Sequence, residues 1–188
     1  MGSLRIIGGS ARGRRLAGPK GEGLRPTSDR VRQVIFDVLG QRFDGGEVLD
    51  LYAGTGALGL EAISRGATRA RLVDRSPEAL ALCQANAAAL GFQDRVATSK
   101  RSLPGDLVGL VGPVDLLFAD PPYGEADACP EVLRWLAASG MLSPGGVAVL
   151  EHDRRISLSP RIEGVHPLVR SDERSFGDTR VSFYRRDS

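Results

Sequence analysis

The segment Glu47-Val48-Leu49-Asp50-Leu51-Tyr52-Ala53-Gly54-Thr55-Gly56-Ala57-Leu58-Gly59 determines the architecture of the chain. Its first five residues are typical of a buried strand, and residues 57–65 have the pattern of a helix. Between them, Gly54 and Gly56 allow the backbone to approach a ligand closely, and the start of the helix offers N–H groups that have no partner inside the helix. Strand, glycine turn and helix together predict a nucleotide-type binding loop in an α/β protein.

A carboxylate ends the next predicted strand, Arg69–Asp74. Asp74 lies about 20 residues beyond the glycines, where an acid accepts the ribose hydroxyls of an adenosine-containing cofactor. The glycines also match the G-x-G-x-x-G pattern of nicotinamide-dependent dehydrogenases. Asp50 argues against that class, because a carboxylate at the mouth of the site suits the amino group of an amino-acid-bearing ligand and repels a pyrophosphate. The chain also shows no hydride-transfer residues and no second domain for a substrate.

The rest of the chain alternates helices with strands. Helices are predicted from Ser76 to Gly91 and over residues 127–139, and further strands over residues 95–98, 114–119 and 146–150. Such alternation predicts a mostly parallel sheet with helices on both faces. The last strand-like segments lack a helix between them and are expected to form an antiparallel hairpin at one edge of a seven-stranded sheet. These segments are Ile162–Val169 and Arg180–Tyr184, joined by Ser171–Asp178.

The tetrapeptide Asp120-Pro121-Pro122-Tyr123 directly follows the predicted strand over residues 114–119. It is therefore expected at the carboxyl end of a strand, where open α/β sheets bind ligands. Two prolines remove two N–H donors, so the carbonyls of Asp120 and Pro121 remain available as acceptors. Acceptors beside an aromatic face suit a planar base with an exocyclic amino group. The alternative is an ordinary turn that ends a strand, because Asp and Pro are common turn formers.

Length and composition indicate one globular domain. The chain has 188 residues, of which 41% are hydrophobic and 26% charged. No apolar run reaches membrane-spanning length and the N-terminus lacks the apolar core of a signal peptide, so a cytoplasmic location is expected. Cys83 and Cys129 lack metal-ligand spacing and are expected to be reduced thiols, and His152 and His166 are isolated. We expect no bound metal and no Cys/His/acid arrangement for nucleophilic catalysis.

The N-terminal region is strongly basic although the net charge of the whole chain is only +2. Residues 1–33 contain eight basic and two acidic side chains, so the rest of the chain has a net charge of −4. A basic arm on a slightly acidic body is typical of proteins that grip phosphates, although a solvated, flexible tail has the same composition. The candidate RNA contacts are Arg5, Arg12, Arg14, Arg15, Arg25, Arg30 and Arg32.

Local structure is predicted within this basic arm. Strand-like pieces at residues 4–9 and 14–17 predict a small hairpin. A helix is expected over about residues 29–40, capped by Thr27 or Ser28. The cations expected to face outward just before and along this helix are Arg25, Arg30 and Arg32.

The segment Leu49–Ala62 and the tetrapeptide together resemble the S-adenosylmethionine-dependent amino-methyltransferases. More narrowly, the chain is similar to the bacterial family that methylates the 2-amino group of one guanine in 16S ribosomal RNA. The residues that resemble this family are Arg5-Ile6-Ile7-Gly8-Gly9, Arg25-Pro26-Thr27-Ser28-Asp29-Arg30-Val31-Arg32 and Phe176-Gly177-Asp178-Thr179. The resemblance covers nearly the whole chain and implies a Rossmann-like class I methyltransferase fold. It also implies a basic N-terminal extension over residues 1–42, which contacts RNA and closes over the cofactor, and an S-adenosylmethionine-binding domain over residues 43–188.

The resemblance implies roles for single residues as well. The acceptor site would consist of Asp120, Pro121, Pro122 and Tyr123. Asp50 and the glycine loop would hold the methionine part of the cofactor, Asp74 its ribose, and Arg75 would border the adenine. Such enzymes usually carry a polar or acidic residue after the third strand, whereas this chain has Lys100 and Arg101. Either Ser102 or a backbone carbonyl is therefore expected to meet the adenine, or apolar packing mainly holds it. The implied cofactor contacts are Thr27, Asp50, Tyr52, Ala53, Gly54, Thr55, Gly56, Asp74, Arg75 and Ser102.

The implied substrate is 16S ribosomal RNA in a partly or fully assembled small subunit, and a monomeric enzyme is expected. The same tetrapeptide would also serve methylation of DNA adenine or cytosine, or of a protein glutamine. The basic arm favours a nucleic acid over a protein but does not separate RNA from DNA. A different class of function is a ribosome-assembly binding protein that has lost activity, and the intact Asp50, Asp74 and Asp120 argue against it.

Overall fold

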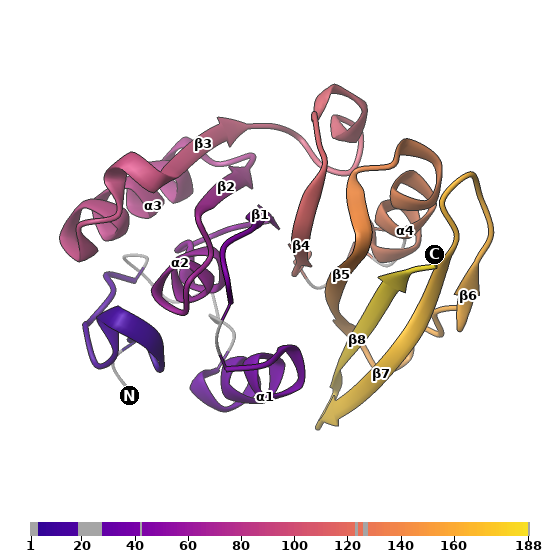
Figure 1. Ribbon diagram of the computed structural model, residues 1–188, viewed down its shortest axis with the longest axis horizontal. Helices are drawn as coiled ribbons and strands as arrows, with labels where there is room; N and C mark the ends of the chain where they lie inside the picture. Colours follow the sequence, from indigo (N-terminus) through magenta and orange to yellow (C-terminus); the bar gives the residue numbers. More distant parts are fainter. Residues whose placement is uncertain (1–3, 19–27, 42, 123, 126–127, 188) are drawn as a thin grey trace. The chain divides into compact units, whose positions relative to one another are not determined.

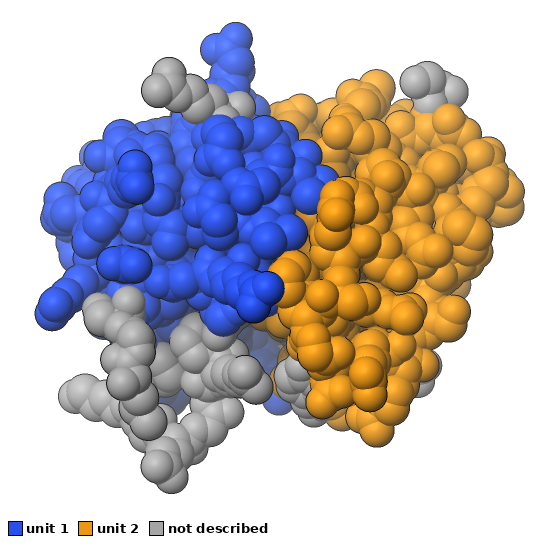
Figure 2. All heavy atoms as spheres, turned by 90° about the horizontal axis from the view of Figure 1, so that it is seen from below, with its two compact units in different colours: residues 1–101 blue, residues 102–188 orange. Residues whose placement is uncertain are grey.

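The computed structural model describes residues 4–18, 28–41, 43–122, 124–125 and 128–187. The chain divides into two compact units, Met1–Arg101 and Ser102–Ser188, which are blue and orange in Figure 2. The expected boundary between residues 42 and 43 stays a prediction. The described part of the basic extension belongs to the first unit, because its backbone hydrogen-bonds to the helix that follows the glycine loop.

The first unit contains a parallel three-stranded sheet in the order β3-β2-β1 (Figure 1). Helix α2 packs against β1 and β2, and helix α3 packs against β2 and β3. The strands are β1 (Glu47–Leu51), β2 (Arg69–Asp74) and β3 (Val96–Lys100). The helices are α1 (Asp29–Leu39), α2 (Ala57–Ser64) and α3 (Pro77–Leu90), with short 3-10 turns η1 (Gly9–Ala11) and η2 (Gln93–Arg95).

The N-terminal hairpin is present in a short form. Arg5 and Arg15 form an isolated antiparallel bridge, and backbone hydrogen bonds flank it on both sides. The side chains of Ile6 and Leu16 are buried beside it. These apolar contacts add to the backbone hydrogen bonds that the hairpin donates to Glu61 and Ser64, and its arginines are exposed at the surface.

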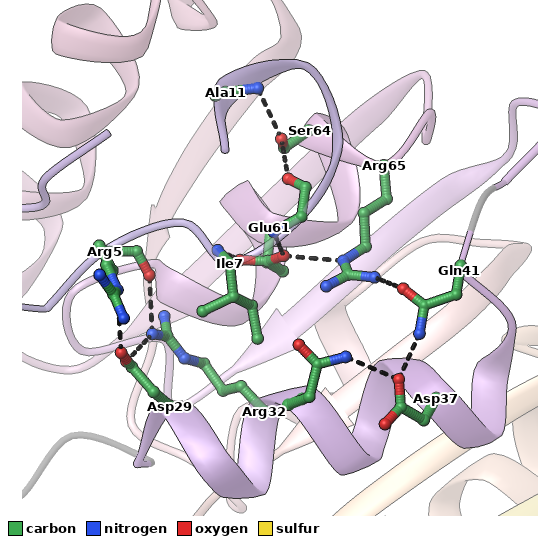
Figure 3. A network of polar contacts seen from close by, with 12 residues as sticks. Arg5, Ile7, Ala11, Asp29, Arg32, Asp37, Gln41, Glu61, Ser64 and Arg65 are labelled. Atoms are coloured by element: carbon green, nitrogen blue, oxygen red, sulfur yellow. Dashed lines mark hydrogen bonds and ion pairs between the residues drawn. The ribbon is translucent and has the colours of Figure 1, made fainter. Parts of the chain in front are cut away.

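Helix α1 begins after Ser28, whose Oγ accepts the N–H of Val31 at 3.3 Å, so one of the two expected caps is confirmed. The outward placement predicted for Arg32 is wrong, because this side chain is fully buried. Its guanidinium donates to Oδ1 of Asp29 at 2.5 Å and to the carbonyl of Arg5 at 2.8 Å (Figure 3). The acid one turn earlier compensates the buried charge. The buried residues of the helix are Val31, Arg32, Ile35 and Phe36.

The second unit combines one parallel and three antiparallel strand pairs. Strands β4 and β5 are parallel, and β5, β8, β7 and β6 follow in antiparallel order (Figure 1). Helix α4 packs against β5, β6 and β7. The elements are η3 (Leu107–Gly109), β4 (Val114–Ala119), α4 (Ala128–Ser139), β5 (Leu142–Asp153), β6 (Arg161–Ile162), β7 (Leu168–Phe176) and β8 (Thr179–Arg186).

The C-terminal strands differ from their predicted bounds. The single strand expected over Ile162–Val169 is instead the end of β6 and the start of β7, which makes eight strands rather than seven among the described residues. Most of Ser171–Asp178, the expected connection, is strand β7. Its polar side chains pair across and along the hairpin, as in the ion pair of Arg170 with Glu173 at 2.8 Å, so strand pairing forms without an apolar alternation.

The expected fold class is nevertheless confirmed. Pairs β1–β2, β2–β3 and β4–β5 are parallel, and the C-terminal strands are antiparallel. Helices of the described residues are all too short or too polar to cross a membrane.

Candidate active site

The loop between β1 and α2 has an unusual backbone conformation. Tyr52 has a φ of 61°, and Gly54 and Gly56 have φ angles of 55° and 76°. A positive φ in a tyrosine costs about 1–2 kcal/mol and typically marks a site where the surroundings impose the conformation. Gly56 is the N-cap of α2 and provides no side-chain acceptor to the first turn of the helix. A Cβ on Gly54 would meet only the carbonyl of Tyr52, at 4.0 Å, so the loop faces open space at this glycine.

Asp50 lies beneath this loop rather than at its mouth. It is only 2% exposed, and its Oδ2 accepts the N–H of Gly59 at 2.9 Å. Gly59 is in the first turn of α2, so the carboxylate caps the helix from the neighbouring strand. The carboxylate is thus buried in the structure, and its predicted contact with the amino group of a ligand remains a proposal.

Asp74 joins the glycine loop to the end of β2. Its Oδ2 accepts the N–H of Gly54 and its Oδ1 accepts the N–H of Ser76, both at 2.9 Å. A carboxylate has about four lone-pair positions, so these two bonds leave acceptor capacity for ribose hydroxyls. The half-buried acid, the open side of Gly54 and the uncapped start of α2 fit an adenosine-containing cofactor.

Asn86 is a residue of this site that the sequence did not single out. Its Nδ2 donates to the carbonyl of Thr55 at 3.0 Å and to the carbonyl of Ala17 at 3.1 Å. Its Oδ1 accepts the N–H of Ala17 at 2.8 Å. This buried amide on α3 thus links the glycine loop to the N-terminal segment. A helical Asn has no motif of its own, so only the tertiary contacts reveal its role.

The other residues predicted to contact the cofactor do not gather at the open side of the glycine loop in the same way. Ala53 and Thr55 are buried in the loop, and Arg75 is exposed beyond β2. Thr27 lies outside the described residues. Ser102 belongs to the second unit, where its N–H donates to Asp106 at 2.7 Å. The role of each of these residues toward the cofactor stays a prediction.

We expect Gly54→Ala to weaken cofactor binding beyond its effect on stability. Alanine at this positive φ costs about 1 kcal/mol of folding free energy, and its methyl group enters the open side of the loop. One misplaced methyl group in a binding site lowers affinity by about tenfold or more. Gly91→Ala is the matched control, because Gly91 has a φ of 77° and nothing within 4 Å of a Cβ. Calorimetric titration with S-adenosylmethionine should show a loss for Gly54→Ala alone, and equal affinities would refute the assignment of the loop.

The second unit has a cavity of about 240 Å³ where β4 and β5 end. Asp120 and Pro121 lie at its edge and are half-buried, as expected for residues that follow a strand. Tyr123 lies outside the described residues, so its predicted stacking role is untested. The residues that line the cavity are Asp120, Pro121, Pro122, Gly124, Glu125, Cys129, Glu151, His152, Asp153, Arg155 and Ile156.

Two charged groups of this cavity are paired with each other. Arg155 donates to Asp153 through its backbone N–H at 2.8 Å, through Nε at 2.9 Å and through Nη2 at 2.6 Å. The side-chain hydrogen bonds of Arg155 lower the pKa of Asp153 to about 2. Asp153 is therefore ionised and held by Arg155 throughout the physiological pH range.

His152 is buried in the wall of the cavity. Its Nε2 is 2.9 Å from Oγ of Ser182, and its Nδ1 is 3.0 Å from the carbonyl of Asp153. Burial lowers the pKa of His152, and this effect exceeds the opposing influence of the Asp153 carbonyl and of Glu173. The imidazole is therefore neutral near pH 7 and contributes a fixed polar contact to β8.

We expect this histidine to destabilise the fold in mild acid. The unfolded chain binds a proton with an ordinary pKa near 6.5 and the folded chain binds it less well, so stability is complete above pH 6.5 and falls below it. The slope cannot exceed that of one proton, about 1.4 kcal/mol per pH unit. Unfolding followed between pH 7 and pH 5 should show a steeper loss for the wild type than for His152→Gln. Parallel curves would contradict a neutral, buried imidazole.

The predicted RNA contacts are all in the first unit. Arg12, Arg15 and Arg30 are exposed. Arg14 is also exposed, although one of its nitrogens donates to the carbonyl of Ala89. The other positions differ: Arg5 is 58% exposed and pairs with Asp29, Arg32 is buried, and Arg25 lies outside the described residues.

Solved structures with this fold include two methyltransferase-like proteins. The Escherichia coli protein yhhF superimposes with a TM-score of 0.83 at 30% identity, covering 100% of this chain and 99% of that one. An RNA methyltransferase from Salinibacter ruber in complex with S-adenosyl-L-homocysteine has a TM-score of 0.61 at 16% identity, covering 86% and 93%. The second likeness concerns the fold alone. The fold is that of the class I, Rossmann-like methyltransferases.

The family expected from the sequence is also confirmed. The model of the family described as "Conserved hypothetical protein 95" matches residues 4–185, and the chain belongs to this family. Among its relatives, "Ribosomal RNA small subunit methyltransferase D" of Escherichia coli K12 is 32% identical over 187 residues, covering 100% of this chain and 92% of the relative. Family membership therefore extends over the glycine loop, the tetrapeptide and the basic extension together.

Proposed function

We propose that this protein transfers a methyl group from S-adenosylmethionine to the exocyclic 2-amino group of a guanine in 16S ribosomal RNA. The observation that supports this function most is the position of Asp120. It is followed by two prolines and lies at the edge of a cavity where β4 ends. The family relationship to a small-subunit ribosomal RNA methyltransferase supports the RNA as the substrate class.

The tetrapeptide addresses the main chemical difficulty of the reaction. An aryl amine is a poor nucleophile because its lone pair is delocalised into the ring. Asp120 and the carbonyl of Pro121 accept the two N–H hydrogens, which draws the nitrogen toward a pyramidal geometry and directs its lone pair outward. The prolines fix this acceptor geometry without donors of their own. The reaction then depends on positioning more than on a strong base.

The first unit is assigned to the cofactor. S-Adenosylmethionine bound there would supply the methyl group for the amine nitrogen, with a neutral thioether as the leaving group when its carbon–sulfur bond breaks. The methylated nitrogen then loses one proton, to Asp120 or to water. Asp74 would hold the ribose hydroxyls, and the backbone of Gly54 and Gly56 would hold the methionine part.

Binding of RNA is assigned to the exposed cations of the first unit. Arg12, Arg15 and Arg30 offer guanidinium groups to phosphates, and Arg12 also lines a groove of about 750 Å³ beside the hairpin. These contacts would position the RNA without reading its sequence. Because the chain is small and has little surface for reading a large RNA, we propose a partly or fully assembled small subunit as the substrate. We also propose that the enzyme is a monomer and acts in the cytoplasm.

Methyl transfer from radiolabelled S-adenosylmethionine to small ribosomal subunits from cells that lack this protein tests the proposal. The expected product after nuclease digestion is labelled 2-methylguanosine from 16S RNA. Transfer to DNA adenine or cytosine, or to a protein glutamine, when DNA or protein replaces the subunits, would move the activity to another acceptor. Cofactor binding without any transfer would indicate a binding protein that has lost activity.

A further inference from the structure

We infer that Glu151 is a second carboxylate of the acceptor site and accepts the ring N1–H of the target base, which makes the site selective for guanine. The inference rests on the proposed function, because it concerns the same acceptor base. It assigns the choice between guanine and other amino-bearing bases to one side chain.

The strand register sets Glu151 beside Asp120. Strands β4 and β5 are parallel, and Ala119 is the register partner of Leu150. Asp120 directly follows the end of β4, and Glu151 directly follows Leu150 on β5, so the two acids lie next to each other at the carboxyl ends of adjacent strands. Neighbouring strands are about 4.8 Å apart, and residues in matching register point to the same face. Two carboxylates therefore leave the sheet together on one side.

The surroundings of Cys129 support this placement independently. Its Sγ lies 3.5 Å from the carbonyl oxygen of Glu151. Burial, and after it the charges of Asp120 and Glu151, raise the pKa of the thiol to about 12. Both carboxylates thus act on one buried atom, and both line the same cavity.

The chemistry of the bases explains what a second carboxylate selects. Guanine presents two donors side by side, the 2-amino group and N1–H. In adenine and cytosine the ring nitrogen next to the amino group is an acceptor. A carboxylate at that place accepts a hydrogen bond from guanine and faces a lone pair in the other two bases. Asp120 can hold an amino group of any base, whereas Glu151 distinguishes the ring nitrogen beside it.

The other acids of the cavity are less suited to this role. Asp153 is bound by three hydrogen bonds from Arg155. Glu125 lies in the turn after the prolines, where its N–H donates to the carbonyl of Pro122 at 3.2 Å. Glu151 stands on β5, where it pairs with Val181 of β8, so its backbone position is fixed by the sheet. A rigid support is what discrimination between similar bases requires.

The test compares guanine with 2-aminopurine, which keeps the 2-amino group but has a lone pair at N1. Once the methylated nucleotide is mapped, subunits are reconstituted with guanosine or 2-aminopurine riboside at that position. The wild type and Glu151→Gln are assayed on both for kcat/KM. Glu163→Gln is the matched control, because Glu163 is a 76% exposed carboxylate of the same unit outside the cavity. Binding of S-adenosylmethionine and unfolding of each variant show whether the fold is intact.

We expect the wild type and Glu163→Gln to prefer guanine by at least about 100-fold, the discrimination of a site that hydrogen-bonds a donor absent from the analogue. Glu151→Gln should reduce this preference at least about tenfold, since a glutamine amide can rotate to donate to the N1 lone pair. 2-Aminopurine also lacks the O6 atom of guanine. This loss affects the wild type and Glu151→Gln alike, so it cancels when their preferences for guanine are divided by one another.

The inference fails if Glu151→Gln keeps the wild-type preference, or if the wild type methylates both bases equally. The second outcome needs no variant, so a Glu151→Gln that does not fold still leaves the inference testable. Absence of labelled 2-methylguanosine with the wild type on guanosine subunits would instead overturn the proposed function, and the inference with it.

Discussion

Asp120→Ala is expected to reduce methyl transfer by about 1,000-fold or more while leaving the affinity for S-adenosylmethionine within about twofold. The carboxylate is one of two acceptors that hold the amine, and alanine removes both the hydrogen bond and the negative charge beside the nitrogen that becomes positive. The glycine loop and Asp74, which are assigned to the cofactor, belong to the other unit and keep their contacts. Single-turnover methylation of small subunits, combined with calorimetric titration of the cofactor, measures the two effects separately.

Asp115→Ala is the matched control for this substitution. Asp115 is an exposed residue near the start of β4, whereas Asp120 directly follows the end of the same strand. Its removal should leave methyl transfer close to the wild-type rate. A loss of cofactor affinity in Asp120→Ala as large as its loss of rate would contradict the division of roles between the two units.

The elements that position the site follow from local sequence rules. Strand β1 has the predicted bounds because its apolar side chains need a buried sheet, and the loop after it needs glycines at Gly54 and Gly56 for their positive φ angles. Strand β4 also has the predicted bounds, and it delivers Asp120 to a carboxyl end. These are short-range requirements, and single residues satisfy them.

Features that depend on tertiary pairing were not predictable in the same way. The polar sequence of β7 resembles a loop, and only its pairing with β8 makes it a strand. Arg32 is on the buried face of α1 because Asp29 and a backbone carbonyl of the hairpin receive its guanidinium. Glu151 has no motif around it, and its proximity to Asp120 follows from the β4–β5 register. In each case the partner that decides the role is distant in sequence.

Glu61 is the anchor of the N-terminal hairpin and is fully buried on α2 (Figure 3). Its Oε2 accepts the N–H of Ile7 at 2.8 Å, and its Oε1 accepts the N–H of Gly8 and Nε of Arg65, both at 2.7 Å. The guanidinium of Arg65 lies 4.6 Å from the ring centre of Phe36 on α1. One carboxylate thus joins the hairpin, α2 and, through Arg65, α1.

We expect Glu61→Ala to lower the free energy of unfolding by about 3–5 kcal/mol, because it leaves a buried guanidinium and two N–H groups without their acceptor. Glu61→Gln should lose less, since an amide oxygen still accepts one bond. Asp94→Asn, an exposed carboxylate of the same unit, is the control and should be neutral. Denaturant unfolding measures the loss, and hydrogen exchange should show the amides of Ile7 and Gly8 losing protection first. If Glu61→Ala cost less than about 1 kcal/mol, the hairpin would have to be held by its apolar contacts through Ile6 and Leu16 instead.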